Sequence, residues 1–169
     1  MPAFFKPLLL PMKKEGNVMS TFIKTSLGIE FEQELCEICR ETFHNMGDIK
    51  GFQSVNGTKA DIEQGTDCYI WGVPVDFTYN FEGKDFTEEL PESIITREAT
   101  IRFGVRTGNS HNGYTKFDTP VLVIGIDETD SFVRMFLGNI VETFKNKLMD
   151  IINLGQDQYW EYLDAQGLA

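Results

Sequence analysis

Two short extended runs that meet at a glycine constrain this chain more than any other feature. Residues 66–71 and 73–80 are rich in β-branched and aromatic side chains, and Gly72 lies between them. The first run carries Asp67 and the second carries Asp76. If the runs pair through Gly72, the two carboxylates lie close together at one end of a sheet. Because Mg²⁺ and Mn²⁺ prefer hard oxygen ligands, the sequence predicts a divalent-metal site here.

The residues around these aspartates resemble a known nuclease motif. Asp67, eight further residues and then residues 76–78 (DFT) are similar to the PD-(D/E)XK pattern, a strand aspartate followed by acid-X-lysine on the next strand. The approach over residues 61–67 (DIEQGTD) also resembles that superfamily. Upstream, residues 28–32 (GIEFE) resemble its first-helix motif, whose acid is carried here by Glu32.

The resemblance covers residues 28–126 and implies a fold, a cofactor and a reaction. The fold would be restriction-endonuclease-like. Asp67, Asp76 and Glu32 would hold one or two ions of Mg²⁺ or Mn²⁺. The reaction would be metal-dependent hydrolysis of DNA phosphodiesters, which makes the chain a candidate magnesium-dependent deoxyribonuclease.

Thr78 stands where the family has its lysine, and this departure bears on catalysis more than on the fold. A neutral hydroxyl cannot supply the positive charge that stabilises a reacting phosphate. Lys59, Lys84, Arg102 and Arg106 are the candidate replacements. Strand alternation aims Arg102 and Arg106 the same way, either as a phosphate-facing pair or as part of a polar sheet face. The predicted catalytic residues are Asp67, Asp76, Thr78, Glu32, Arg102 and Arg106.

The charge of the chain favours a second hypothesis. The formal net charge is −11, whereas proteins that bind nucleic acid usually have a basic balance. A catalytically silent, acidic relative of a nuclease, encoded by a phage, could instead bind a DNA-processing protein and block it. Anti-CRISPR proteins and other inhibitors of bacterial defence are of this kind. A third hypothesis makes Asp67 and Asp76 ordinary strand-end carboxylates of a structural domain.

Hydrophobic periodicity predicts two long helices. The first covers residues 26–46, with Ser26 as its N-cap. The second begins at Asp130 or Ser131 and ends before Gly155. A short aromatic helix follows it.

Several strands lie between these helices. The segment 82–92 is predicted to be a loop or a short helix, and 108–118 a turn-rich loop. This order indicates an α/β or α+β domain whose mixed sheet of four to six strands is flanked by an N-terminal and a long C-terminal helix. The predicted strands are residues 49–55, 66–71, 73–80, 94–106 and 120–126.

The N-terminal residues and the cysteines bear on origin and compartment. Residues 1–18 contain three prolines and are expected to be disordered or an over-extended gene reading. In the second case translation starts at Met19 in a bacterium or phage. In both cases residues 19–169 are expected to form one nuclease-like domain. Cys36, Cys39 and Cys68 form no disulfide framework, which favours the cytoplasm of a bacterial or phage-infected cell. No membrane partner is expected.

Overall fold

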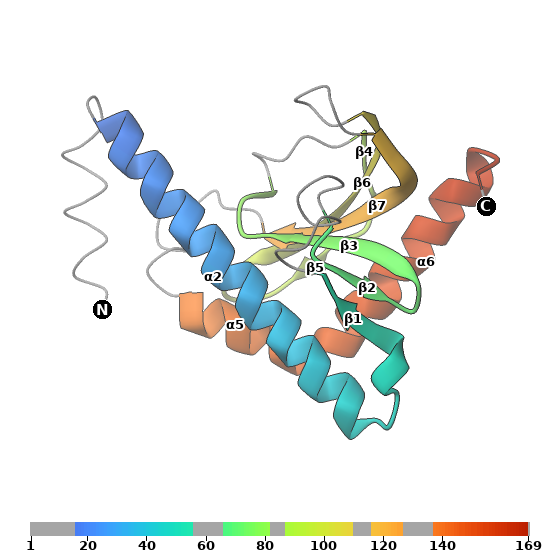
Figure 1. Ribbon diagram of the computed structural model, residues 1–169, viewed down its shortest axis with the longest axis horizontal. Coiled ribbons are helices and arrows are strands. Elements are labelled where there is room, and N and C mark those ends of the chain that lie inside the picture. The colour runs from blue at the N-terminus through green and yellow to red at the C-terminus, as the bar shows by residue number, and fades with distance from the viewer. Residues whose placement is uncertain (1–15, 56–65, 82–86, 110–115, 127–136, 169) are drawn as a thin grey trace.

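The computed structural model describes residues 16–55, 66–81, 87–109, 116–126 and 137–168, and these build a sheet with helices packed against it (Figure 1). The helices are α2 (Gly16–Asn45), α5 (Leu137–Asn146) and α6 (Leu148–Ala165), with a short 3-10 turn at Ile49–Gly51. The strands are β1 (Phe52–Ser54), β2 (Cys68–Ile70), β3 (Val73–Thr78), β4 (Glu88–Glu89), β5 (Ile94–Ile95), β6 (Thr100–Asn109) and β7 (Lys116–Ile126).

The predicted mixed α/β architecture is confirmed, but the sheet is larger than predicted. It has seven strands in the order β1-β2-β3-β7-β6-β4, with β5 also paired to β6. The prediction of four to six strands is wrong because part of the supposed loop 82–92 forms β4. The run 94–106 also divides into β5 and β6 at a turn, where the Thr96 amide donates to the Ala99 carbonyl at 3.0 Å.

One pair of neighbouring strands is parallel. β3 pairs with β7 in the register Val75↔Leu122, while the other pairings are antiparallel. A parallel pair requires a crossover connection, which in many α/β folds is a helix. Here the described residues between β3 and β7 form strands and turns instead. The segment 88–95, which begins in the stretch predicted to be a loop or a short helix, contains the short strands β4 and β5.

Apolar side chains of all three helices form the core against one sheet face. Phe31 of α2 meets Phe144 of α5 edge-to-face, with ring centroids 5.5 Å apart. Tyr159 of α6 is buried, and its hydroxyl donates to the Pro120 carbonyl at 2.6 Å. This core buries Val73, Val75 and Phe77 of β3. β7 contains the predicted apolar strand 120–126 but begins at Lys116, inside the segment predicted to be a turn-rich loop.

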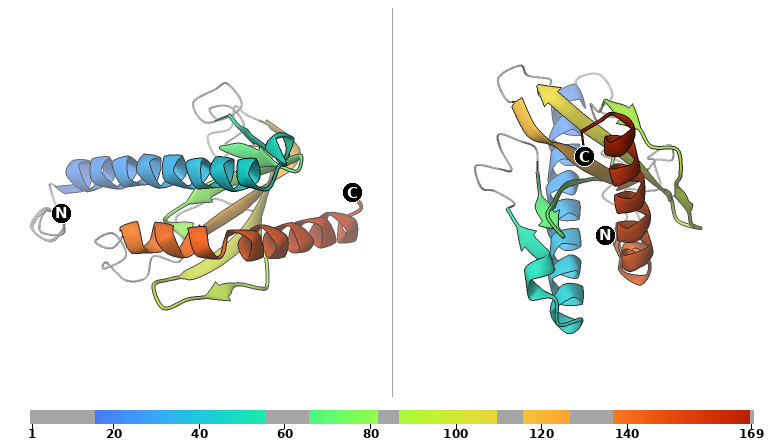
Figure 2. Two further views of the ribbon diagram at one scale, coloured as in Figure 1. Left: turned by 90° about the horizontal axis from the view of Figure 1, so that it is seen from below. Right: turned by 90° about the vertical axis from the view of Figure 1, so that its right-hand side faces the viewer.

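Both long helices differ from their predicted bounds. Helix α2 already begins at Gly16, so Ser26 lies inside it and is not its N-cap. The predicted break at Gly155 is also wrong, because Gly155 lies within α6 and packs against the sheet. A Cβ at this position would come 2.9 Å from a ring carbon of Phe103. The break falls instead at Lys147, and α6 follows directly on α5 (Figure 2).

Candidate metal centre

A tight hairpin brings Asp67 and Asp76 together. β2 and β3 are joined by a two-residue turn in which Trp71 has φ 49° and Gly72 has φ 83°. Two positive φ angles are the mark of the turn that best fits the twist of a two-residue hairpin. The regular pairing of the two strands ends at Cys68, opposite Val75. One residue earlier, the Asp67 amide donates to the Val75 carbonyl at 2.8 Å. This bond holds Asp67 against β3, where its carboxylate lies close to that of Asp76.

Helix α2 adds a third carboxylate to this pair. Glu32, Asp67 and Asp76 each offer one oxygen, and these atoms all lie within 4.8 Å of one another. Asp67 and Asp76 are buried, whereas Glu32 is half-buried. The structure thus brings together the three residues predicted as metal ligands, and their separations are small enough for one cation to contact all three.

Burial and mutual repulsion make it unfavourable for all three carboxyl groups of this cluster to be ionised together. Burial, the neighbouring charges of Asp76 and Glu32 and a hydrogen bond with Asp76 raise the pKa of Asp67 to about 11. The backbone amide of Phe77 donates to Asp67 Oδ2 at 2.8 Å and opposes that shift. Without a cation, Asp67 therefore holds a proton at neutral pH in contact with Asp76. A divalent ion could displace this proton, as metal binding to acidic ligands commonly does.

An arginine from the far side of β7 completes the cluster. Arg106 Nη2 donates to Asp76 Oδ2 at 3.1 Å, and both side chains are almost fully buried. The sheet register places Asp76, Val123 and Gly104 in one cross-strand row. Gly104 has no side chain that would stand between Arg106 and Asp76 in this row. Arg106 is thus the candidate cation that the structure places against an acid of the cluster.

The other predicted catalytic residues lie one row further along the same face. This row contains Thr78, Gly125 and Arg102. The Thr78 hydroxyl accepts a hydrogen bond from the Asn80 amide at 3.1 Å and so caps the end of β3. Arg102 makes an ion pair with Glu89.

The predicted six-residue set is therefore divided. Glu32, Asp67, Asp76 and Arg106 gather in one cluster, whereas the described partners of Thr78 and Arg102 lie elsewhere. The remaining candidate cations, Lys59 and Lys84, fall outside the described residues.

Sequence reasoning missed a thiol pair beside the carboxylates. Cys36 and Cys39 are buried on α2, as predicted for small apolar residues. Cys36 also hydrogen-bonds with Cys68 of β2, and this contact is the main cause of its lowered pKa. The available signal was positional, because Cys36 follows Glu32 by one helical turn and Cys68 follows Asp67 directly. The elements that bring the acids together also bring the thiols together.

Two further findings, on membrane-spanning helices and on related proteins, are negative. Among the described residues, no helix combines the length and apolar character needed to cross a membrane. Comparisons of the chain with protein-family models, with curated proteins and with solved structures find no match.

Proposed function

We propose that this chain is a metal-dependent nuclease-like protein that acts on DNA phosphodiesters. The observation that carries the proposal is the convergence of Glu32, Asp67 and Asp76 within 4.8 Å at a largely buried place. Burying charged carboxylates is unfavourable unless a cation or proton compensates them. Three of them from a helix and two strands suit Mg²⁺ or Mn²⁺, which take carboxylate oxygens as ligands.

The proposed reaction is phosphodiester hydrolysis assisted by a divalent ion bound to the three acids. In hydrolysis a water oxygen bonds to phosphorus, the bond from phosphorus to a sugar oxygen breaks, and the water proton passes to the leaving oxygen or to solvent. A bound divalent ion would supply charge stabilisation and lower the pKa of water. Arg106 stands beside Asp76 and would contribute the fixed positive charge that Thr78, in the family's lysine position, cannot provide.

The restriction-endonuclease-like fold and the choice of DNA are part of the proposal. The hairpin with adjacent acids and the helical Glu32 support them, since these match the order of the family's motif. The extended segment 88–95 is the feature that agrees least with that family. The proposal also places the protein in the cytoplasm of a bacterial or phage-infected cell.

Cleavage and metal binding should be measured on the full chain. Wild type is incubated with single-stranded and duplex DNA in Mg²⁺, Mn²⁺ or EDTA, and Mn²⁺ binding is followed by calorimetry. We expect metal-dependent cleavage that Asp76→Ala abolishes and Glu34→Gln retains, because Glu34 is an exposed acid on the same helix. Equal inertness of wild type and Asp76→Ala would refute catalysis. No binding at millimolar Mn²⁺ would refute the metal centre.

A second function is favoured by the way the cluster is neutralised without an ion. Arg106 pairs with Asp76, and Asp67 retains a proton. With the net charge of −11, this arrangement suits a silent inhibitor of anti-CRISPR type that binds a basic surface of a DNA-processing protein. Such a chain would bind its target equally well in Mn²⁺ and in EDTA. Affinity purification at low salt that recovers no DNA-processing protein would count against it.

A further inference from the structure

A second arginine lies on the same sheet face as the metal cluster. Arg102 and Arg106 are four residues apart on β6, and their rows lie on either side of the row that contains Asp76. Rows two residues apart along a strand are separated by about 6.6 Å. That spacing is similar to the distance between adjacent phosphates of an extended nucleotide strand. Along the strands Arg102 is therefore offset by about one nucleotide from the acid that would hold the metal ion, and across the sheet it lies two strands from that acid, with β7 between them.

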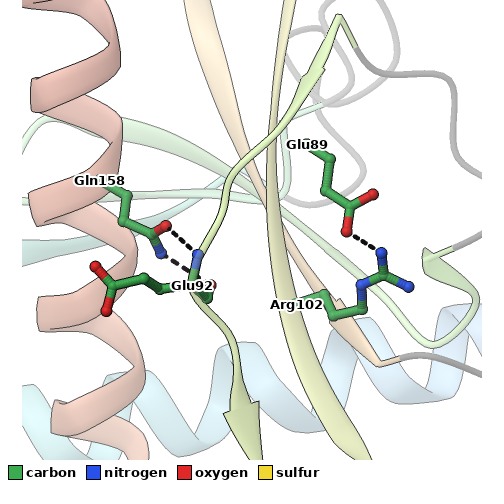
Figure 3. A network of polar contacts seen from close by, with 4 residues as sticks. All are labelled: Glu89, Glu92, Arg102 and Gln158. Atoms are coloured by element: carbon green, nitrogen blue, oxygen red, sulfur yellow. Dashed lines mark hydrogen bonds and ion pairs between the residues drawn. The ribbon is translucent and has the colours of Figure 1, made fainter.

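We propose that Arg102 binds the phosphate next to the reacting one, and that Glu89 competes with this phosphate for the arginine. The proposal rests on the function proposed above and adds a contact with the substrate and an internal competitor. Glu89 of β4 forms an ion pair with Arg102 (Figure 3). A carboxylate and a phosphate present similar oxygen acceptors to a guanidinium fork, so each would occupy the same donors.

The surroundings of Arg102 suit a side chain that exchanges its partner. Its guanidinium carbon lies 5.1 Å from the centre of the Phe81 ring, and Phe81 itself is buried. This stacking on a fixed ring orients the guanidinium. The side chain of Arg102 is 22% exposed and that of Glu89 is 43% exposed. Ion pairs with this much exposure add little stability, so a phosphate could replace the carboxylate at small cost.

The segment that carries Glu89 is held in place by other contacts. The side-chain amide of Gln158 accepts from the Glu92 amide at 2.8 Å and donates to the Glu92 carbonyl at 3.1 Å (Figure 3). The Leu90 amide also donates to the Phe103 carbonyl at 2.8 Å. Neutralising Glu89 therefore removes the competing charge and leaves β4 attached to the sheet and to α6.

The experiment compares two substitutions that a purely structural ion pair would not separate. Binding of a labelled 12-nucleotide single strand is measured by fluorescence anisotropy, with Ca²⁺ in place of Mn²⁺ to slow cleavage. We expect Arg102→Gln to weaken binding and to reduce the slope of log affinity against log salt by about 0.7, the value for one lost single-strand phosphate contact. We expect Glu89→Gln to tighten binding, because the arginine loses its competitor.

A matched pair on α2 controls for net charge. Arg40 also makes an ion pair, with Glu37, and lies over an aromatic ring, 5.8 Å from the centre of Phe52. Arg40→Gln and Glu37→Gln change the charge of the protein by the same amounts. We expect these variants to alter affinity by less than the corresponding β6 and β4 variants and to leave the salt slope unchanged.

The outcomes separate this proposal from the proposed nuclease activity. Opposite shifts for Arg102→Gln and Glu89→Gln, beyond those of the controls, support the phosphate contact even if wild type never cleaves DNA. Shifts in the same direction, or shifts equal to the controls, overturn it even if wild type cleaves DNA with Mg²⁺. A wild-type chain that does not bind the strand overturns it as well.

Discussion

Two arginines on one face of β6 make ion pairs that differ in their surroundings. Arg106 and Asp76 join side chains that are 11% and 5% exposed. Arg102 and Glu89 join side chains that are 22% and 43% exposed. Both arginines come from one strand in one regular pattern, so burial of the partner is the main difference between the pairs.

This difference determines what each pair can do. When a buried charge loses its partner, no water takes the partner's place. Removing either member of a buried pair is therefore strongly destabilising. A partly exposed charge is solvated when its partner leaves, so the pair contributes little to stability. The Arg106 pair is therefore suited to fixing the geometry of the carboxylate cluster, and the Arg102 pair to exchanging partners.

Removal of the buried arginine should have the largest effect. Arg106→Gln leaves Asp76 in contact with two other acids and without its guanidinium partner. We expect a loss of about 3–5 kcal/mol in the free energy of unfolding, measured by urea denaturation in EDTA at pH 7. A loss below about 1 kcal/mol, the range typical of exposed pairs, would show that the two arginine pairs are energetically alike.

Addition of Mn²⁺ should also distinguish the Arg106 pair from the Arg102 pair. An ion that binds only the folded state adds about 2.7 kcal/mol of stability when its concentration is 100 times its Kd. We expect this stabilisation to be larger in Arg106→Gln than in wild type, because the ion then compensates Asp76. Arg102→Gln should be stabilised as much as wild type. Thermal melts with and without Mn²⁺ test this, and equal stabilisation of all three proteins would contradict it.

The pH dependence of stability reports on the proton of Asp67. The pKa of this group rises from 3.8 to about 11 on folding. Between these values the folded state holds a proton that the unfolded state lacks, so stability falls as pH rises. One such proton corresponds to a slope of about 1.4 kcal/mol per pH unit at most.

Urea denaturation in EDTA from pH 5 to pH 8 measures this slope. Asp67→Asn carries no proton to lose and should flatten it, while its amide oxygen can still accept from the Phe77 amide. Mn²⁺ displaces the proton and should flatten it too. A wild-type slope that is unchanged in Asp67→Asn would assign the pH dependence to other groups.

The smallest effect is expected at the exposed pair. Arg102→Gln should change the free energy of unfolding by less than about 1 kcal/mol, as is typical of exposed ion pairs. Arg40→Gln, whose ion pair with Glu37 lies on the surface of α2, provides the reference value. A loss for Arg102→Gln close to that for Arg106→Gln would mean that the Arg102 pair also holds the sheet together.

Part of the fold and of the site could be predicted because it depends on local patterns. The glycine turn and the alternation in residues 66–80 predicted a hairpin with Asp67 near Asp76, and the structure has that hairpin. Helix ends were less predictable. Ser26 and Gly155 have the residue types of a cap and a terminator, yet both lie inside helices. In the case of Gly155 the reason is close packing on Phe103, which only the folded chain reveals.

The sequence by itself determined that two acids lie on the two arms of a hairpin, because Gly72 separates two β-prone runs. It also determined that Arg102 and Arg106 share a face, because side chains alternate in an extended chain. Only the tertiary structure decided that Glu32 joins the acids and that Arg106 rather than Arg102 pairs with Asp76. These contacts join segments far apart in the chain. They depend on how α2 and β6 are placed against β3, and no local pattern encodes that placement.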